Sequence, residues 1–205
     1  MGVAAITQAF INLQVQESLA AKRALANDSR LLATIKEGCD LLVAAYRRGN
    51  KTLLAGNGGS AADAQHIAAE LVCRFYFDRP GLPAMALTTD SSVLTAISND
   101  YGYEELFARQ LQANGRGGDV FIAISTSGNS KNVIKGVLAA KELGITTIGL
   151  VGAGGGAMED LCDLCIRAPS YSTPRIQECH ILIGHILCAA VEEALFGKDE
   201  GSALA

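Results

Sequence analysis

After two opening helical patterns, short apolar runs alternate with amphipathic stretches, and this alternation restricts the fold more than any other feature. We expect strands at Thr52–Ala55, Pro83–Leu87, Val120–Ile124, Ile145–Val151 and Cys162–Arg167. Helices are predicted between and after them, at roughly Ala61–Cys73, Ser91–Ser98, Glu104–Ala113, Lys131–Leu143 and Arg175–Leu195. Such alternation predicts an α/β fold, with a parallel sheet covered by helices on both faces. Sheets of this kind bind ligands at the carboxyl ends of their strands.

The two opening patterns predict helices at about Ala4–Ala26 and Asp28–Arg48. Asp28 or Ser29 can cap the second helix, because short polar side chains accept hydrogen bonds from the first N–H groups of a helix. At 205 residues the chain is long enough for one domain with a full core. We therefore expect a single domain over residues 1–205, with two N-terminal helices in 1–48 and the α/β core in 49–205.

Charge and composition exclude several classes of protein. The net charge is −4 and no run of Lys or Arg offsets it, which argues against a nucleic-acid partner. No stretch approaches the roughly 20 uninterrupted apolar residues of a membrane span. The N-terminal pattern carries charged residues and does not match a secretory signal. We expect a cytoplasmic protein that binds neither nucleic acid nor a membrane.

The six cysteines fit a reducing compartment, since most lie in apolar stretches where a thiol acts as a small hydrophobic group. Cys162 and Cys165 form a CxxC pair. Both fall in a predicted strand, where positions three apart point to opposite faces, so a redox or zinc role for the pair is disfavoured.

Two loops carry the first sign of function. Gly56-Asn57-Gly58-Gly59-Ser60 follows the first strand directly and opens a helix, with Ser60 as a suitable N-cap. Taken alone, this loop could be a tight turn with a cap. Ser125-Thr126-Ser127-Gly128-Asn129-Ser130 follows a second strand and also opens a helix. Hydroxyls and N–H groups at a helix start suit a phosphate, and the absence of the GxxxxGK[ST] pattern indicates a single phosphate rather than a nucleotide triphosphate.

A third glycine-rich stretch, Gly152–Ala157, formally matches a dinucleotide fingerprint. That fingerprint needs an acidic residue about 20 positions on, and the corresponding region, Ala168–Ser172, has none. We interpret this stretch as a flexible lid or a connection and do not expect a nicotinamide cofactor.

Side chains able to transfer protons or hold a metal lie on two predicted helices. His66 and Glu70 are four residues apart and share a helix face, a spacing found in metal sites and equally in surface pairs. The C-terminal helix carries Gln177, His180 and His185. A histidine in an apolar run is often only a core residue, but Glu70 near a phosphate loop favours a functional interpretation.

The combined motifs resemble a known family. The Ser-Thr-Ser-Gly-Asn-Ser loop and the strand–helix alternation resemble the sugar isomerase (SIS) domain, a flavodoxin-like three-layer fold. A closer resemblance, to the sedoheptulose 7-phosphate isomerases or phosphoheptose isomerases, covers essentially the whole chain. It rests on Gly56–Ser60, His66–Glu70, Arg79–Gly81, Ser98–Gly102 and Arg175–His180. Ala55 and Ser98 depart from the family, which often has Cys and Gly there.

The resemblance implies conversion of D-sedoheptulose 7-phosphate to D-glycero-D-manno-heptose 7-phosphate, the first step toward the ADP-heptose of the lipopolysaccharide core. It implies a homotetramer with active sites between subunits, a role of residues 1–48 in oligomerisation, and one zinc per subunit. Glu70 and His185 would be the acid/base pair, and the metal would be held by His66, Glu70, Gln177 and His185. The phosphorylated seven-carbon sugar would be bound by Asn57, Gly58, Gly59, Glu70, Asn99, Asp100, Ser125, Thr126, Ser127, Ser130 and Gln177.

The chemistry asks for the same residue types. Moving a carbonyl from C2 to C1 needs a base that takes a proton from one carbon and returns it to the next through an enediol, which suits Glu70. A histidine can donate to the developing oxyanion, which suits His185. Gln177 and His185 are eight residues apart, so about 12 Å of helix rise separates them and one metal should not take both from one chain. We therefore expect two subunits to contribute to the site.

Two other functions remain open from the sequence. Some SIS-domain relatives bind the bacterial replication initiator and have lost catalysis, but they typically lack the residues at the positions of Glu70 and His185, and both are present here. An isomerase or sensor of another phosphosugar, such as an amino sugar, is excluded only weakly.

Overall fold

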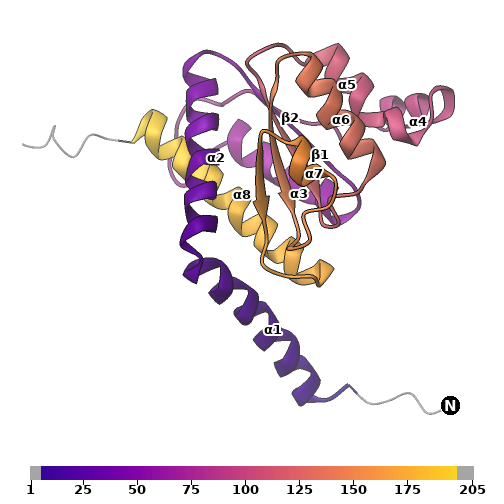
Figure 1. Cartoon of the computed structure of the whole chain (residues 1–205). Helices are drawn as coiled ribbons and strands as arrows, with labels where there is room; N and C mark the ends of the chain where they lie inside the picture. Colours follow the sequence, from indigo (N-terminus) through magenta and orange to yellow (C-terminus); the bar gives the residue numbers. More distant parts are fainter. Residues whose placement is uncertain (1–5, 198–205) are drawn as a thin grey trace, which may run out of the picture.

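The computed structural model describes residues 6–197, and in this range the strands form one five-stranded sheet, all parallel (Figure 1). The strand order is β2-β1-β3-β4-β5. Their bounds are Thr52–Gly56 for β1, Ala84–Ala86 for β2, Val120–Ser125 for β3, Thr146–Val151 for β4 and Leu164–Arg167 for β5. This is the flavodoxin-like order, in which the ligand crevice lies between β1 and β3. The predicted fold class is confirmed.

The helices lie close to their expected positions. Their bounds are Gln8–Asn27 for α1, Ser29–Arg47 for α2, Gly59–Val72 for α3, Ser91–Asp100 for α4, Leu106–Asn114 for α5, Lys131–Glu142 for α6, Met158–Leu161 for α7 and Thr173–Phe196 for α8, with a 3-10 turn η1 at Tyr103–Glu105. The expected start of the first helix, at Ala4, lies outside the described residues. Asp28 caps α2, as predicted: its carboxylate accepts from the N–H groups of Arg30 and Leu31. The short helix α7 was not predicted.

Two apolar cores cover the two faces of the sheet. One joins α1, α2, α3 and α8 to the sheet face that carries Leu54, Ile122 and Ile148. The other joins α4, α5, α6 and α7 to the opposite face, with Leu53 and Phe121. Consecutive strand residues therefore alternate between the cores, which explains why the strands read as continuous apolar runs.

The helices α3 and α8 pack side by side and run in the same direction. Gly59 opens α3 against Gln177 near the start of α8, Ile67 packs on Gly184 farther along, and the segment after α3 reaches Glu192 near the end of α8. By length and composition alone, α8 could span a membrane. It packs against α1, α2 and α3, however, and this packing explains its apolar composition, which is typical of a core helix.

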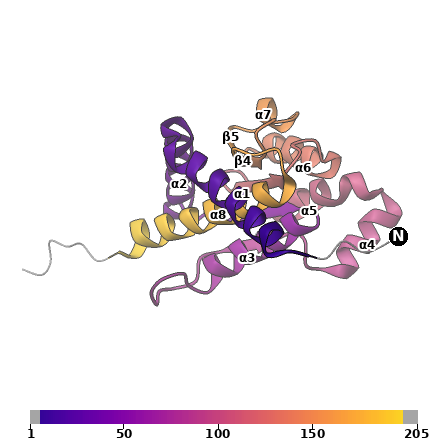
Figure 2. The ribbon, with the colours of Figure 1, turned by 90° about the horizontal axis from the view of Figure 1, so that it is seen from below.

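The helix α1 projects from the body of the molecule (Figures 1 and 2), and its contacts with α8 begin near its middle, where Arg175 donates to the Gln14 carbonyl at 2.6 Å. Its buried residues are Ala21 and Leu25. Large apolar side chains stand exposed along the remainder, namely Phe10, Ile11, Leu13, Val15 and Leu19.

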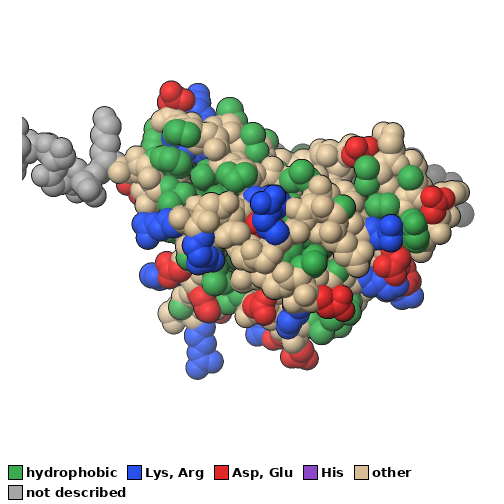
Figure 3. All heavy atoms as spheres, turned by 90° about the horizontal axis from the view of Figure 1, so that it is seen from above, with side chains coloured by type: hydrophobic (Ala, Val, Ile, Leu, Met, Phe, Trp, Pro, Cys, Tyr) green, Lys and Arg blue, Asp and Glu red, His purple; other side chains and the backbone are tan. Residues whose placement is uncertain are grey.

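Hydrophobic side chains also gather over the part of the surface where α2 and α8 lie, while acidic and basic side chains are interspersed over this face (Figure 3). A groove of about 390 Å³ runs between these two helices. Its apolar lining includes Ile35, Val43, Ile186 and Ala190.

The CxxC pair differs from expectation. Cys162 lies outside β5, just after α7, and only Cys165 is in the strand. A Cβ atom at Gly149 of β4 would lie 2.8 Å from the sulfur of Cys162 and 3.5 Å from that of Cys165, so both sulfurs pack against the same side of β4. The expectation of opposite faces was wrong because α7 delays the start of the strand. Burial raises the pKa of both thiols, to about 12 for Cys162 and about 11 for Cys165, which makes them poor nucleophiles.

Candidate active site

The helix α3, which follows the loop after β1, begins two residues earlier than expected. Gly58 has φ +56°, a conformation that favours glycine, and the helix starts at Gly59. Ser60 is therefore not the N-cap: it is buried in the first turn, where a Cβ on Gly56 would lie 2.7 Å from it. The N–H groups of Ser60 and Ala61 donate to the Asn57 and Gly58 carbonyls, so an anionic or hydroxyl-bearing ligand would meet the N–H groups ahead of them, at Gly58 and Gly59.

The side chain of Asn57 is held by two residues that sequence reasoning missed. Its amide exchanges two hydrogen bonds with the buried Asn132 at the start of α6, both 2.9 Å long. The hydroxyl of Tyr103 donates to the same Asn57 oxygen at 2.8 Å. These contacts tie the Gly56–Ser60 loop to α6 and to η1, and they occupy the Asn57 side chain. Only the position of Tyr103 beside the Ser98–Gly102 motif could have hinted at its role.

The loop after β3 gathers hydroxyl groups at the start of α6. The Ser125 hydroxyl lies 2.9 Å from that of Ser130 and 3.5 Å from that of Ser127. The backbone N–H of Asn129 donates to the Ser127 hydroxyl. Ser125 is buried and Ser127 is exposed, while Thr126 is half-buried. The predicted phosphate-binding residues are thus together at one helix N-terminus, at the carboxyl end of β3.

The glycine-rich stretch after β4 packs directly on this loop. Gly152 N–H donates to the Thr126 carbonyl, and Ala157 N–H donates to the Asn129 side chain. Gly128, at φ +65°, approaches the Gly155 carbonyl so closely that a Cβ would overlap it. Of the two interpretations offered above, the structure favours a connection fastened to the hydroxyl loop.

A cluster of three possible metal ligands forms where α3 meets α8. The Nε2 atom of His66 lies 3.1 Å from a Glu70 carboxylate oxygen and 3.4 Å from Nε2 of His185. The three ligand atoms all lie within 4.8 Å of one another. His66 is exposed while Glu70 and His185 are half-buried, so this cluster is open to a substrate. The structure therefore brings together both predicted acid/base residues.

These three residues suit zinc. Ligands bound to tetrahedral zinc at about 2.0–2.1 Å lie about 3.3 Å from one another, close to the two distances from His66. Two imidazoles and one carboxylate are a ligand set of catalytic zinc sites, which leave a fourth position for another ligand.

Gln177 does not join the cluster. Its amide packs against Gly59, where a Cβ would overlap it, so it lies at the beginning of the α3–α8 pair. His185 lies eight residues farther along α8, about 12 Å by helix rise. Within one chain, three of the four predicted metal ligands are together and the fourth is apart.

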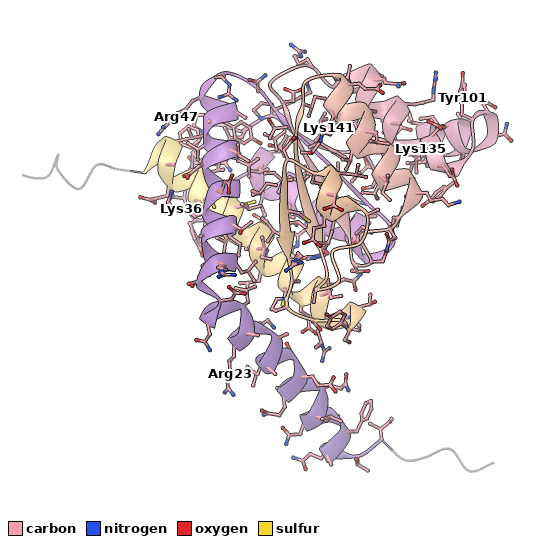
Figure 4. The ribbon with its side chains drawn as sticks, in the orientation of Figure 1. Arg23, Lys36, Arg47, Tyr101, Lys135 and Lys141 are labelled. Carbon is pink, nitrogen blue, oxygen red and sulfur yellow. The ribbon has the colours of Figure 1, made fainter. Side chains whose placement is uncertain are left out.

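Asn99 and Asp100 end α4 and are exposed, and the Asn99 amide donates to the Asp100 carboxylate at 2.8 Å. The next residue, Tyr101, lies over the guanidinium of Arg109. Figure 4 shows Tyr101 and Lys135 at the α4 end of the molecule, and Lys135 pairs with Glu105 of η1 at 2.6 Å. Asn99 and Asp100 thus lie next to the segment that contains Tyr103, whose hydroxyl donates to Asn57.

His180 has a structural role. It is fully buried, and one ring nitrogen, Nε2, contacts the Val151 carbonyl at the end of β4 at 3.1 Å. Burial lowers the pKa of His180 to about 4, although the contact with Val151 opposes the shift. The ring is therefore neutral at pH 7, and Nε2 donates to the carbonyl.

The comparisons with known proteins agree with this geometry. The family model described as the SIS domain matches residues 19–152. The chain is 63% identical over 187 residues to a phosphoheptose isomerase of Aneurinibacillus thermoaerophilus, covering 91% of this chain and 94% of that protein. The solved phosphoheptose isomerase of Neisseria gonorrhoeae is 41% identical, with a TM-score of 0.85, and the match covers 91% of this chain and 98% of that one. That of Francisella tularensis is 36% identical, with a TM-score of 0.88, and covers 92% and 100%.

Proposed function

Since the chain belongs to the phosphoheptose isomerases of the SIS-domain family, we propose that it converts D-sedoheptulose 7-phosphate to D-glycero-D-manno-heptose 7-phosphate. The observation that carries this proposal is the meeting of Glu70 and His185, from different helices, in a molecule whose hydroxyl loop after β3 suits a phosphate. A phosphate loop alone would support only binding. A carboxylate and an imidazole within one cluster can also transfer protons, which isomerisation requires.

The substrate phosphate binds at the start of α6. Ser125, Thr126, Ser127 and Ser130 supply hydroxyl groups, and the helix N-terminus favours the negative charge. The loop containing Gly58 and Gly59 binds the sugar through its backbone, because the Asn57 side chain is already held by Asn132 and Tyr103. Asn99, Asp100 and Gln177 complete the sugar site.

Proton transfer takes place at Glu70 and His185. The Glu70 carboxylate removes a proton from C1 of the ketose, which gives an enediol, and the proton returns to C2 as the carbonyl moves to C1. His185 donates a proton to O2, on which negative charge develops, and takes the proton of the O1 hydroxyl as the carbonyl forms at C1. The wall of α3 and α8 holds both groups in place, so little reorganisation accompanies the reaction.

The cofactor in this proposal is one zinc per subunit, held by His66, Glu70 and His185 together with Gln177 of the partner subunit. Zinc supplies a Lewis acid to the substrate oxygens when it is bound. The distances around His66 support this ligand set, and the separation of Gln177 from His185 supports the contribution of a second chain.

The assembly is proposed to be a homotetramer in which residues 1–48 and the groove between α2 and α8 form subunit contacts. The exposed apolar side chains of α1 support this role. We place the enzyme in the cytoplasm, and its product on the route to the ADP-heptose of the lipopolysaccharide core.

The test is turnover of a panel of five-, six- and seven-carbon ketose phosphates by the zinc-loaded protein. Sedoheptulose 7-phosphate should give the highest kcat/KM, and a preference for a shorter or amino sugar would reject the proposed substrate. Glu70→Gln and His185→Ala should each lower kcat at least about 1,000-fold while leaving the assembly intact. Near-normal turnover in either variant would reject the acid/base pair.

Mixed assemblies test the shared site. Glu70→Gln and Gln177→Ala subunits, each impaired alone, are unfolded and refolded together. If Gln177 acts across the interface, some mixed sites combine an intact cluster with an intact Gln177, and activity returns. If all four ligands acted within one chain, no mixed site would be complete and activity would stay at the level of the separate variants.

A further inference from the structure

The last turn of α8 buries a carboxylate that the proposed mechanism does not use. Glu192 is fully buried, and a buried charge is costly unless it is paired and hydrogen-bonded. Its two oxygens accept from the backbone N–H groups of Phe75 (2.8 Å), Tyr76 (2.6 Å) and Phe77 (3.2 Å) and from Nε of Arg79 (3.0 Å). Three successive N–H groups thus converge on one anion. The carboxylate sets the conformation of the irregular segment that follows α3.

Arg79 connects this carboxylate to the end of α3. Its guanidinium donates to the Glu70 carbonyl at 2.9 Å and to the Leu71 carbonyl at 2.7 Å. These carbonyls belong to the last turn of the helix, where intrahelical partners are missing. The side chains of both Arg79 and Glu192 are 1% exposed, so solvent screens their interaction little. The backbone at Glu70 is therefore anchored by the pair.

Phe75 connects the same carboxylate to the cluster. Its ring lies 5.4 Å from the ring of His185, centroid to centroid, and the ring of His66 lies 5.0 Å away from His185 in an edge-to-face arrangement. His185 is thus enclosed between Phe75 and His66. The position of Phe75 depends in turn on the N–H bond that its own residue makes to Glu192.

We propose that Glu192 is a positioning residue for the isomerase site, which acts on Glu70 through Arg79 and on His185 through Phe75. This inference rests on the function proposed above. Glu192 touches neither substrate nor metal ligand. It fixes the orientation of the His185 imidazole and the position of the Glu70 carboxylate. Proton transfer depends on both, because it is sensitive to displacements of about a few tenths of an ångström.

A matched control lies at the amino end of the central strand, β3. Asp119, just before β3, is also a fully buried carboxylate. It pairs with Lys51 at 2.6 Å and accepts from the N–H groups of Lys51 and Arg116. None of these hydrogen-bond partners belongs to the cluster at α3 and α8. Asp119→Asn and Glu192→Gln therefore make the same chemical change in similar surroundings, and only one of them is connected to His185.

The experiment compares Glu192→Gln, Phe75→Leu and Asp119→Asn in the full-length protein. The chain has three histidines, so labelling each at Cε1 with ¹³C gives three imidazole signals. The ring of Phe75 shifts the signal of His185, which is assigned from its loss in His185→Ala. We expect Glu192→Gln and Phe75→Leu to move this signal and to lower kcat about 10- to 100-fold, with KM within about twofold. Asp119→Asn should lower Tm while leaving the signal and kcat unchanged.

The proposal is overturned if Glu192→Gln lowers Tm as Asp119→Asn does but leaves the His185 signal and kcat unchanged. If Glu192→Gln does not fold, Phe75→Leu tests the same contact without disturbing the buried pair, and an unmoved signal there rejects the proposal. Should the wild-type protein fail to turn over heptulose phosphates, the proposed function fails. In that case the imidazole signal alone still tests whether Glu192 positions His185.

Discussion

His180 and His185 lie five residues apart on α8, yet their surroundings give them different chemistry. His180 points into the core and hydrogen-bonds the end of β4, whereas His185 meets His66 and Phe75 in the open cluster. Nothing in the residue type separates them. The difference follows from the faces of the helix on which they lie.

His180 should make stability depend on pH. Its pKa falls from an ordinary 6.5 to about 4 on folding, because burial disfavours the charged ring. Between these values the unfolded chain binds a proton that the folded chain does not, so the free energy of unfolding decreases as pH falls. We expect a loss of about 2 kcal/mol from this group between pH 7 and pH 5.

Urea unfolding of the metal-free protein at both pH values measures this loss, and His180→Gln serves as the comparison. The variant should be less stable at pH 7 but lose less between pH 7 and pH 5. Equal losses in the two proteins would mean that His180 is not the source of the dependence.

Residue types at the candidate site could be predicted, but their partners could not. Glu70 and His185 stood out because carboxylates and imidazoles are few in these helices. Asn132 and Tyr103 did not, because they reach Asn57 from 75 and 46 residues away. The error at Ser60 has a local cause: the positive φ of Gly58 starts the helix before the serine.

The elements around the crevice depend on contacts between loops. The helix α6, which follows the hydroxyl loop Ser125–Ser130, is tied to the loop after β1 through Asn132 and Asn57, and the hydroxyl loop itself is held by the glycine-rich stretch after β4. Gly128 is the closest point of the second contact. The hydroxyl loop, which is the proposed phosphate site, is therefore shaped by three strand ends.

Gly128→Ala should damage both stability and substrate binding. An alanine at φ +65° costs at least about 1–2 kcal/mol, and its Cβ would also overlap the Gly155 carbonyl. We expect a lower Tm and a KM raised about tenfold or more, because the hydroxyl groups proposed to bind phosphate are displaced. Thermal unfolding and initial-rate kinetics check this.

Gly154→Ala is the control in the neighbouring loop. Gly154 is exposed, and the nearest atom to an added Cβ is 3.8 Å away on Tyr171. Its Tm and KM should match those of the wild-type protein. A Gly128→Ala protein with unchanged KM would show that the glycine contact does not shape the phosphate site.

Element type and order followed from hydrophobic periodicity, because parallel strands buried on both faces read as continuous apolar runs. Boundaries were less secure where two elements meet without a loop. The segment Met158–Arg167 shows this: α7 occupies its beginning, so the strand starts two residues after Cys162. A four-residue helix has too few positions to show a period of 3.6 residues.

The molecule as a whole presents α1 as an apolar helix that only partly packs on its own chain. Ile11, Val15 and Leu19 are spaced four residues apart and form an exposed stripe. Contiguous apolar surface of this kind marks an interaction site. The distance from Gln177 to His185 also supports an assembly, since a complete ligand set would need a second subunit.

We expect Val15→Lys combined with Leu19→Lys to reduce the assembly mass and the activity together. The two charges oppose burial of the stripe, and loss of the proposed interface would remove the proposed fourth ligand. Leu138→Lys on α6 is the matched control, because Leu138 is as exposed as Leu19, at 44% against 39%. Sedimentation measures the assembly mass and turnover measures the activity, both at the same protein concentration. A monomeric double variant with full activity would contradict the shared site.

The parallel course of α3 and α8 has a consequence for which sequence changes the protein can accept. Three levels of contact join the two helices, at Gly59 with Gln177, at Ile67 with Gly184, and at the segment after α3 with Glu192. Inserting or deleting one residue between Gln177 and His185 would turn everything beyond it by about 100° and shift it by about 1.5 Å. His185 would leave the cluster and Glu192 would leave its donors. Natural variants of this stretch should therefore differ by substitution, while its length stays constant.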